Sequence, residues 1–150
     1  MIISVIGAGT CNNETYSIAE EIGKLIAQKG AILVTGGLGG VMEAASKGAI
    51  DAGGTTVGIL PGFSKEDANK YVSIPITTGL SHARNIVIVR SADAVIAVSG
   101  EYGTLSEIAV ALKLGKPVIG IKTWEHIDGL IEAESSQEAV NKAFELVNKQ

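Results

Sequence analysis

The segment between residues 99 and 107 holds the most distinctive chemistry in this sequence. Ser-Gly-Glu-Tyr-Gly-Thr at 99–104 follows an apolar run, and Leu105 then begins a predicted helix. The first N–H groups of a helix lack partners, and glycine lets a ligand approach them, so a phosphate could bind here. The spacing Thr104-x-x-Glu107 is equally typical of a capping box, in which two side chains satisfy backbone donors. The two roles are compatible, and the sequence leaves both open.

Two further glycine-rich turns and one arginine have the same kind of chemistry. Gly-Ala-Gly-Thr at 7–10 follows the first apolar run, and Gly-Gly-Leu-Gly-Gly at 36–40 follows the second. Arg84 stands at a predicted helix start, where its guanidinium could clamp a phosphate or a carboxylate with two parallel hydrogen bonds. A surface salt bridge is the alternative role for Arg84.

Several common cofactor sites find no support in these motifs. A dinucleotide fingerprint would need glycine where Asn12 stands and a carboxylate where Thr35 ends the second strand. Neither glycine turn continues into the Gly-Lys-Ser/Thr of a nucleoside triphosphate site. No metal site is predicted, because His126 has no other metal-ligating residue at suitable spacing. Roles for Cys11, His82 and His126 stay open.

Length and composition indicate one globular domain spanning 1–150. Apolar residues make up 46% of the 150 residues and charged residues 19%, which excludes a disordered chain. The net charge of −4 argues against nucleic acid as a partner. No basic leader and no apolar run of about 20 residues is present, so neither targeting nor a membrane span is expected. With a single cysteine, the sequence is typical of a cytoplasmic protein.

Apolar runs alternate with amphipathic segments along the whole chain. Strands are expected at 2–6, 31–35, 55–60, 72–76, 93–98 and 118–121, with helices between most of them and a last helix opened by a capping box at 135–138. This alternation predicts an α/β fold, a three-layer Rossmann-like doubly wound parallel sheet. Right-handed crossovers favour the strand order 3-2-1-4-5-6.

That strand order opens a crevice between strands one and four, at their carboxyl ends. The loops after strands one, two, four and five border the crevice, so the glycine turns and Arg84 should converge on one pocket. The residues predicted to bind a ligand or its phosphate there are Gly9, Thr10, Gly36, Gly37, Gly39, Gly40, Arg84, Gly100, Tyr102, Gly103 and Thr104.

The helix that begins near Arg84 continues as Ile-Val-Ile-Val at 86–89. A helix that is apolar on every side must be covered both by its own sheet and by something else. The sequence therefore predicts a homo-oligomer, a dimer or tetramer, with this helix at the interface.

Three segments carry a resemblance to a known family. Residues 34–42 resemble a Gly-Gly-Gly-x-x-Gly-Leu-Met turn, residues 81–85 resemble His-x-Arg-Lys, and residues 99–107 are similar to Pro-Gly-Gly-x-Gly-Thr-x-x-Glu. These motifs are those of the Lonely-guy proteins and of their relatives the molybdenum-cofactor carrier proteins, often labelled lysine-decarboxylase-like. Ser99 stands where the motif has proline, Glu101 where it has glycine, and Asn85 where it has lysine. These departures and the run at 88–93 look closer to the carrier-like branch.

The resemblance implies two functions and does not decide whether the chain is an enzyme. The first is a binding or carrier protein for a phosphorylated nucleotide-like or molybdopterin ligand, with no required cofactor. The alternative is a phosphoribohydrolase that cleaves the N-glycosidic bond of nucleoside 5′-monophosphates, with Arg84 and Glu107 as catalytic residues. Lysine decarboxylation has no support, since no lysine falls in the crevice to hold pyridoxal phosphate. A purely structural oligomer would leave the converging glycine turns without a purpose.

Overall fold

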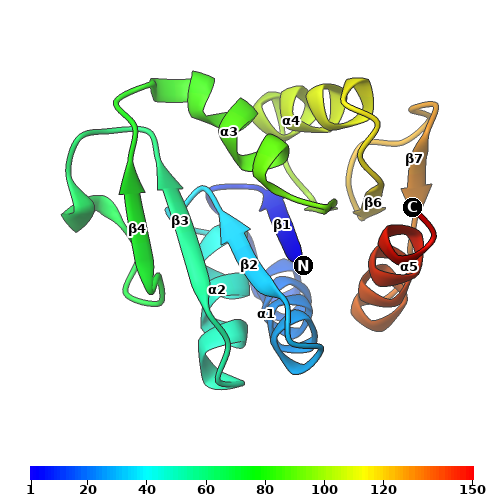
Figure 1. Ribbon diagram of the computed structural model, residues 1–150, viewed down its shortest axis with the longest axis horizontal. Coiled ribbons are helices and arrows are strands. Elements are labelled where there is room, and N and C mark those ends of the chain that lie inside the picture. Colours follow the sequence, from blue (N-terminus) through cyan, green and yellow to red (C-terminus); the bar gives the residue numbers. More distant parts are fainter.

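One sheet of seven parallel strands runs through the centre of the molecule, with helices on both of its faces (Figure 1). The computed structural model describes all residues from 1 to 150. The strands are β1 Ile2–Gly7, β2 Ile32–Thr35, β3 Thr56–Leu60, β4 Ile74–Thr77, β5 Ala94–Val98, β6 Val118–Ile121 and β7 Leu130–Glu132. The helices are α1 Asn13–Gln28, α2 Val41–Asp51, α3 Arg84–Ser91, α4 Tyr102–Lys113 and α5 Ser136–Asn148.

The predicted doubly wound, Rossmann-like fold is confirmed, and one strand lies elsewhere in the sheet. The observed order is β4-β3-β2-β1-β5-β6-β7, so β5 and not β4 pairs with β1. β4 instead extends the sheet beyond β3. It contains Pro75, which has no N–H for a sheet ladder, and its Ile74 and Ile76 are exposed, so this strand suits an edge. The crevice between strands therefore opens between β1 and β5.

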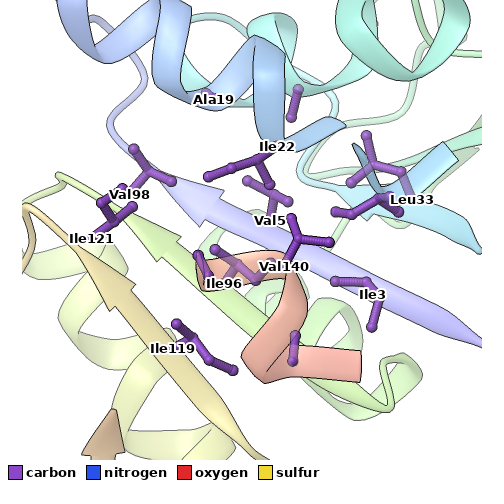
Figure 2. Close-up of a cluster of buried hydrophobic side chains, with 14 of the residues drawn as sticks. Ile3, Val5, Ala19, Ile22, Leu33, Ile96, Val98, Ile119, Ile121 and Val140 are labelled. Carbon is purple, nitrogen blue, oxygen red and sulfur yellow. The ribbon is translucent and has the colours of Figure 1, made fainter. Parts of the chain in front are cut away.

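Each central strand sends alternate side chains into two apolar layers. Ile3 and Val5 of β1 pack with Ile22 of α1 and Val140 of α5 in the layer drawn in Figure 2. Ile6 of β1 belongs to the opposite layer, which α3 and α4 cover. Because both faces are buried, the strands read as continuous apolar runs, as parallel strands do.

Helices α1 and α2 cross at very close range on one face. A Cβ added to Gly23 would stand 1.9 Å from the carbonyl oxygen of Ala45, and one added to Gly48 would stand 1.8 Å from that of Glu20. Glycine at both positions therefore lets the two backbones touch. This contact holds α2, and with it the loop that precedes α2, against the loop after β1.

Helix α3 is covered on one side only within the chain. Of the residues of α3 itself, Ile88 and Val89 are buried, whereas Ile86 is 46% exposed. Leu80, just before the helix, and Ile74 and Ile76 of β4 are exposed as well. None of the helices is both long enough and apolar enough to span a lipid bilayer.

Candidate functional site

A cavity of about 500 Å³ opens at the carboxyl ends of the strands, where the loops predicted to converge do meet. Its walls come from β1 and the loop after it, from the turn after β2, from the start of α3 and from the start of α4. Seven predicted site residues line this cavity: Gly9, Thr10, Gly36, Arg84, Gly103, Thr104 and Glu107. The other five, Gly37, Gly39, Gly40, Gly100 and Tyr102, lie outside its lining.

The turn between β2 and α2 uses its glycines to fit the protein itself. Gly37 has φ +77°, and its N–H donates to Thr35 Oγ1 at 3.0 Å. Gly40 has φ +61°, and a Cβ there would meet the carbonyl oxygen of Ala8 at 2.3 Å. The N–H of Val41 donates to that same carbonyl at 2.9 Å. Backbone conformation and close packing thus account for these glycines without a ligand.

Two cavity-lining glycines have no such internal explanation. Gly9 and Gly103 do not adopt the left-handed conformation, and a Cβ built on either meets no atom within 4 Å. Their missing side chains leave open space at the cavity wall. Glycine at such a point lets a ligand reach the backbone N–H groups.

Helix α4 starts earlier than its sequence predicts. Glu101 is the N-cap residue, and the first helical hydrogen bond runs from Leu105 N–H to the Glu101 carbonyl at 3.0 Å. No side chain caps this helix, so the predicted Thr104-to-Glu107 capping box is wrong: both residues lie inside the helix. The N–H groups of residues 102–104 fall in the first turn, where no helical carbonyl is available to them.

The backbone just before α4 adopts an uncommon conformation. Ser99 has φ +54° and Gly100 has φ +103°. Proline, which holds φ near −65°, could not adopt the Ser99 conformation. The proline of the motif that residues 99–107 resemble is therefore incompatible with this turn. A Cβ on Gly100 would overlap the buried Thr104 side chain, at 2.2 Å from Oγ1.

The loop after β6 holds this turn in place. Ser99 N–H donates to the Ile121 carbonyl at 3.2 Å, and Thr123 Oγ1 donates to the Ser99 carbonyl at 2.6 Å. Trp124 Nε1 donates to the Glu101 carbonyl at 3.0 Å. The ring of Tyr102, 79% exposed, lies 5.7 Å from that of Trp124, outside the cavity. No motif in the sequence predicts these contacts, which join residues more than 20 positions apart.

Arg84 is buried at the cavity wall, with 8% of its surface exposed. One terminal nitrogen donates to Asn85 Oδ1, and the other donates to the Gly36 carbonyl at 3.5 Å. Its Nε is buried and has no partner in the protein. Burial lowers the pKa of Arg84, and the nearby Glu107 opposes that shift. The alternative of a surface salt bridge is thus wrong for this residue.

Glu107 faces the same cavity from the first turns of α4 and is equally buried. Burial raises the pKa of Glu107 to about 8, although the nearby Arg84 lowers it. At neutral pH most of this carboxyl group is therefore protonated. His82 and Glu101, at the cavity's outer part, are the other titratable residues in its lining. No three His, Cys, Asp or Glu side chains are grouped so as to hold a metal ion.

The chain matches the model of the SLOG cluster4 family over residues 1–148. Its fold is similar to the solved structure of the molybdenum cofactor binding protein from the phototrophic bacterium Rippkaea orientalis, with a TM-score of 0.92 and 38% identity over 97% of this chain and 96% of that one. It is also similar to the Moco carrier protein from Chlamydomonas reinhardtii, with a TM-score of 0.90 and 38% identity over 99% and 98% of the two chains.

Two further proteins are similar to this chain in sequence. An uncharacterized protein from Archaeoglobus fulgidus is 54% identical over 94% of this chain and 93% of its own length. A cytokinin riboside 5′-monophosphate phosphoribohydrolase from Mycobacterium tuberculosis is 34% identical over 82% of this chain and 71% of its own.

Proposed function

The chain belongs to the SLOG cluster4 family, within the Lonely-guy-like superfamily and near its molybdenum-cofactor carrier branch, and from this we propose that it binds and carries a small phosphorylated ligand of the molybdopterin type. A nucleotide-like ligand has the same phosphate chemistry and is part of the proposal. The site is the cavity of about 500 Å³ between the loops after β1, β2 and β5, a volume typical of sites for small molecules.

The observation that carries this proposal is the pair of open glycines beside a buried arginine. Because Gly103 has no side chain, a ligand can approach the first-turn N–H groups of α4. Gly9 likewise leaves room beside the backbone of the loop after β1. A helix N-terminus attracts anions through its free N–H groups and its dipole. Together with Thr10, Gly36, Arg84 and Thr104, these glycines are the residues we propose to hold the ligand and its phosphate.

The protonation of Glu107 supports binding more than hydrolysis. In a glycosidic hydrolysis this group would stabilise positive charge that develops on the sugar, which requires an ionised carboxylate. Burial raises the pKa of Glu107 to about 8, so the charge is mostly absent at neutral pH. The positive φ of Ser99 also gives the turn before α4 a shape that the hydrolase-type motif, with proline at that position, cannot adopt.

Retention of the ligand tests the proposal directly. The purified protein is mixed with molybdopterin cofactor released from a molybdoenzyme, separated by gel filtration, and assayed for pterin fluorescence after oxidation. We expect the pterin to elute with the protein at a ratio near one. A protein fraction free of pterin, under conditions in which the cofactor survives, would refute the carrier function.

A phosphoribohydrolase is the second candidate, and one observation favours it. Arg84 and Glu107, its two expected catalytic residues, face the same cavity as Gly103 and Thr104. The relative from Mycobacterium tuberculosis is also named for this activity. Incubation with a panel of nucleoside 5′-monophosphates, followed by chromatography, decides between the candidates: release of free base would support the hydrolase, and intact nucleotides would support the carrier.

The exposed apolar side chains near α3 support a homo-oligomer as part of this proposal. Ile86 and Leu80 are about half exposed, at 46% and 49%, and Ile74 and Ile76 of the edge strand β4 are exposed as well. A second copy of the chain would cover them. Sedimentation velocity at micromolar concentration measures this: a dimer or tetramer is expected, and a monomer would contradict it.

A further inference from the structure

Resting on the proposed function, we infer that Arg84 and Glu107 together recognise the amide edge of the ligand's heterocycle, where a carbonyl oxygen stands beside ring and exocyclic N–H groups. The fused pyrimidinone ring of a pterin has such an edge. In this arrangement the ring lies against the inner wall of the cavity. The phosphate end of the ligand then lies toward the open N–H groups near Gly103.

The guanidinium of Arg84 supplies the donors for the carbonyl oxygen. Arginine has five N–H donors, and the protein accepts one from each terminal nitrogen, through Asn85 Oδ1 and the Gly36 carbonyl. These two bonds fix the plane of the group. Its Nε–H is buried without a partner and has almost no accessible surface, so the donors left for a bound molecule are the second N–H groups of the two terminal nitrogens. The protein thus holds Arg84 in one position and leaves it able to donate further.

Glu107 supplies the matching acceptor. Its carboxyl group is buried at the cavity wall and has no hydrogen-bond partner within the protein. When ionised, the two oxygens of a carboxylate can accept two N–H bonds side by side. Ile6, Met42 and Ile88 also line the cavity and offer apolar contact to a flat ring.

A simple anion fits this wall poorly. A phosphate placed between Arg84 and Glu107 would be attracted by the arginine but would need the carboxyl group to stay protonated. An amide edge satisfies both residues, because it accepts from one and donates to the other. The phosphate of the ligand has its own donors in the first turn of α4.

The two kinds of ligand shift the ionisation of Glu107 in opposite directions. In the free protein its pKa is raised to about 8, so most of the molecules hold this proton at neutral pH. N–H donors stabilise the ionised form and lower the pKa, so binding of an amide edge releases close to one proton. An anion beside Glu107 raises the pKa further, so its binding releases none. The other titratable residues of the cavity are His82, Arg84 and Glu101, and the test must separate them from Glu107.

Titration calorimetry of the intact protein with free pterin, at about pH 7 in two buffers of different ionisation enthalpy, measures the released protons. We expect binding of pterin to release protons, with up to about one proton per pterin bound. Lumazine has a carbonyl in place of the exocyclic amine, and we expect it to bind at least about tenfold more weakly, because one acceptor then faces another. Inorganic sulfate, which has no titratable proton in this range, should bind without proton release.

Two matched variants assign the proton. Glu107→Gln should abolish the release and weaken pterin binding at least about tenfold, whereas Glu101→Gln removes the other carboxylate of the lining and should leave the release in place. Pterin binding without proton release, lumazine binding as tightly as pterin, or no binding of pterin at millimolar concentration would each overturn the inference. If molybdopterin is nevertheless retained in gel filtration, the carrier function stands and only the assignment of this edge fails.

Discussion

The two glycine-rich turns that precede α2 and α4 look alike in the sequence and differ in what their glycines do. In the turn before α2, Gly37 and Gly40 have positive φ and lie so close to neighbouring atoms that no side chain would fit. In the turn before α4, Gly100 also has positive φ and no room for a side chain, but Gly103, in the first turn of the helix, has ordinary φ and faces open space. Gly37, Gly40 and Gly100 are therefore required by the fold of the chain itself, whereas Gly103 leaves room at the cavity wall.

This difference shows that a glycine motif does not by itself identify a ligand site. Glycine can be required by backbone conformation, by a close contact within the chain, or by a molecule that the chain binds. The space around each missing Cβ separates these cases. By that criterion Gly9 and Gly103 are the glycines that we propose for phosphate binding, while the carbonyl of Gly36 accepts a hydrogen bond from Arg84.

The largest expected effect is the loss of stability in Gly40→Ala. Its Cβ would stand 2.3 Å from the Ala8 carbonyl oxygen at φ +61°, so the backbone must shift, and we expect at least about 3 kcal/mol of lost unfolding free energy. Gly53→Ala is the matched control, because Gly53 has φ +80° but open space around its Cβ. It should lose only about 1 kcal/mol. Urea unfolding measures both, and equal losses would show that the contact with Ala8 is unimportant.

The next effect concerns the cost of keeping Glu107 buried. Its pKa is raised from 4.5 to about 8 in the folded protein, so the folded state holds a proton that the unfolded state loses between these values. Stability should therefore fall as the pH rises from about 5 to about 8, by on the order of 1 kcal/mol per pH unit from this group. Glu107→Gln should remove that dependence, with equal stability near pH 5 and higher stability than the parent near pH 9.

The control for this pH prediction is Glu101→Gln, because Glu101 is exposed. Its stability should follow that of the parent protein across the whole pH range. If Glu107→Gln also follows the parent curve in urea unfolding, the carboxyl group is ionised in the folded protein. Glu107 would then carry the charge that a hydrolase needs at neutral pH.

Local patterns predicted most of the fold, and long-range pairing accounts for what they missed. Ser135 caps α5 through the Glu138 N–H at 3.1 Å, as the capping box at 135–138 predicts, and Asn12 caps α1 through the Thr15 N–H at 2.9 Å. The predicted position of β4 beside β1 is wrong, because the order of strands depends on how each strand is buried in the complete sheet. The sequence does not predict β7, because three residues are too few to show the alternation of apolar and polar side chains. This strand is defined only by its pairing with β6.

The candidate site was predicted in the same uneven way. The sequence predicts that Arg84, Glu107 and the glycine turns share one crevice, because loops at the carboxyl ends of parallel strands lie at the same edge of the sheet. It missed the role of Thr123 and Trp124, which hold the turn before α4 through bonds to carbonyls of Ser99 and Glu101. Side chains that bond to distant backbone leave no periodic signal.

A smaller effect is expected at Arg84, which bonds to the carbonyl of Gly36 in the turn before α2. Lysine at this position keeps the charge, but its donors all lie on one nitrogen, so it lacks the planar fork with which Arg84 bonds to Asn85 and Gly36 through separate nitrogens. Arg84→Lys should weaken ligand binding by about 2 kcal/mol, roughly thirtyfold, as measured by calorimetry. Arg90→Lys, an exposed change on the same helix, should leave affinity unchanged. Equal affinities in the two variants would remove Arg84 from the proposed site.

The smallest effect is expected at Gly103, where a substitution should change ligand affinity and protein stability in different ways. Alanine at Gly103 meets no protein atom and replaces glycine in the first turn of α4, so Gly103→Ala should keep or raise stability by up to about 1 kcal/mol. The same methyl group would occupy the space beside the free N–H groups, and we expect phosphate affinity to fall about tenfold. Urea unfolding and a phosphate titration followed by NMR measure the two quantities. A variant that binds phosphate like the parent would show that the open space at Gly103 is not where the anion lies, and the contrast between the two turns would lose its functional meaning.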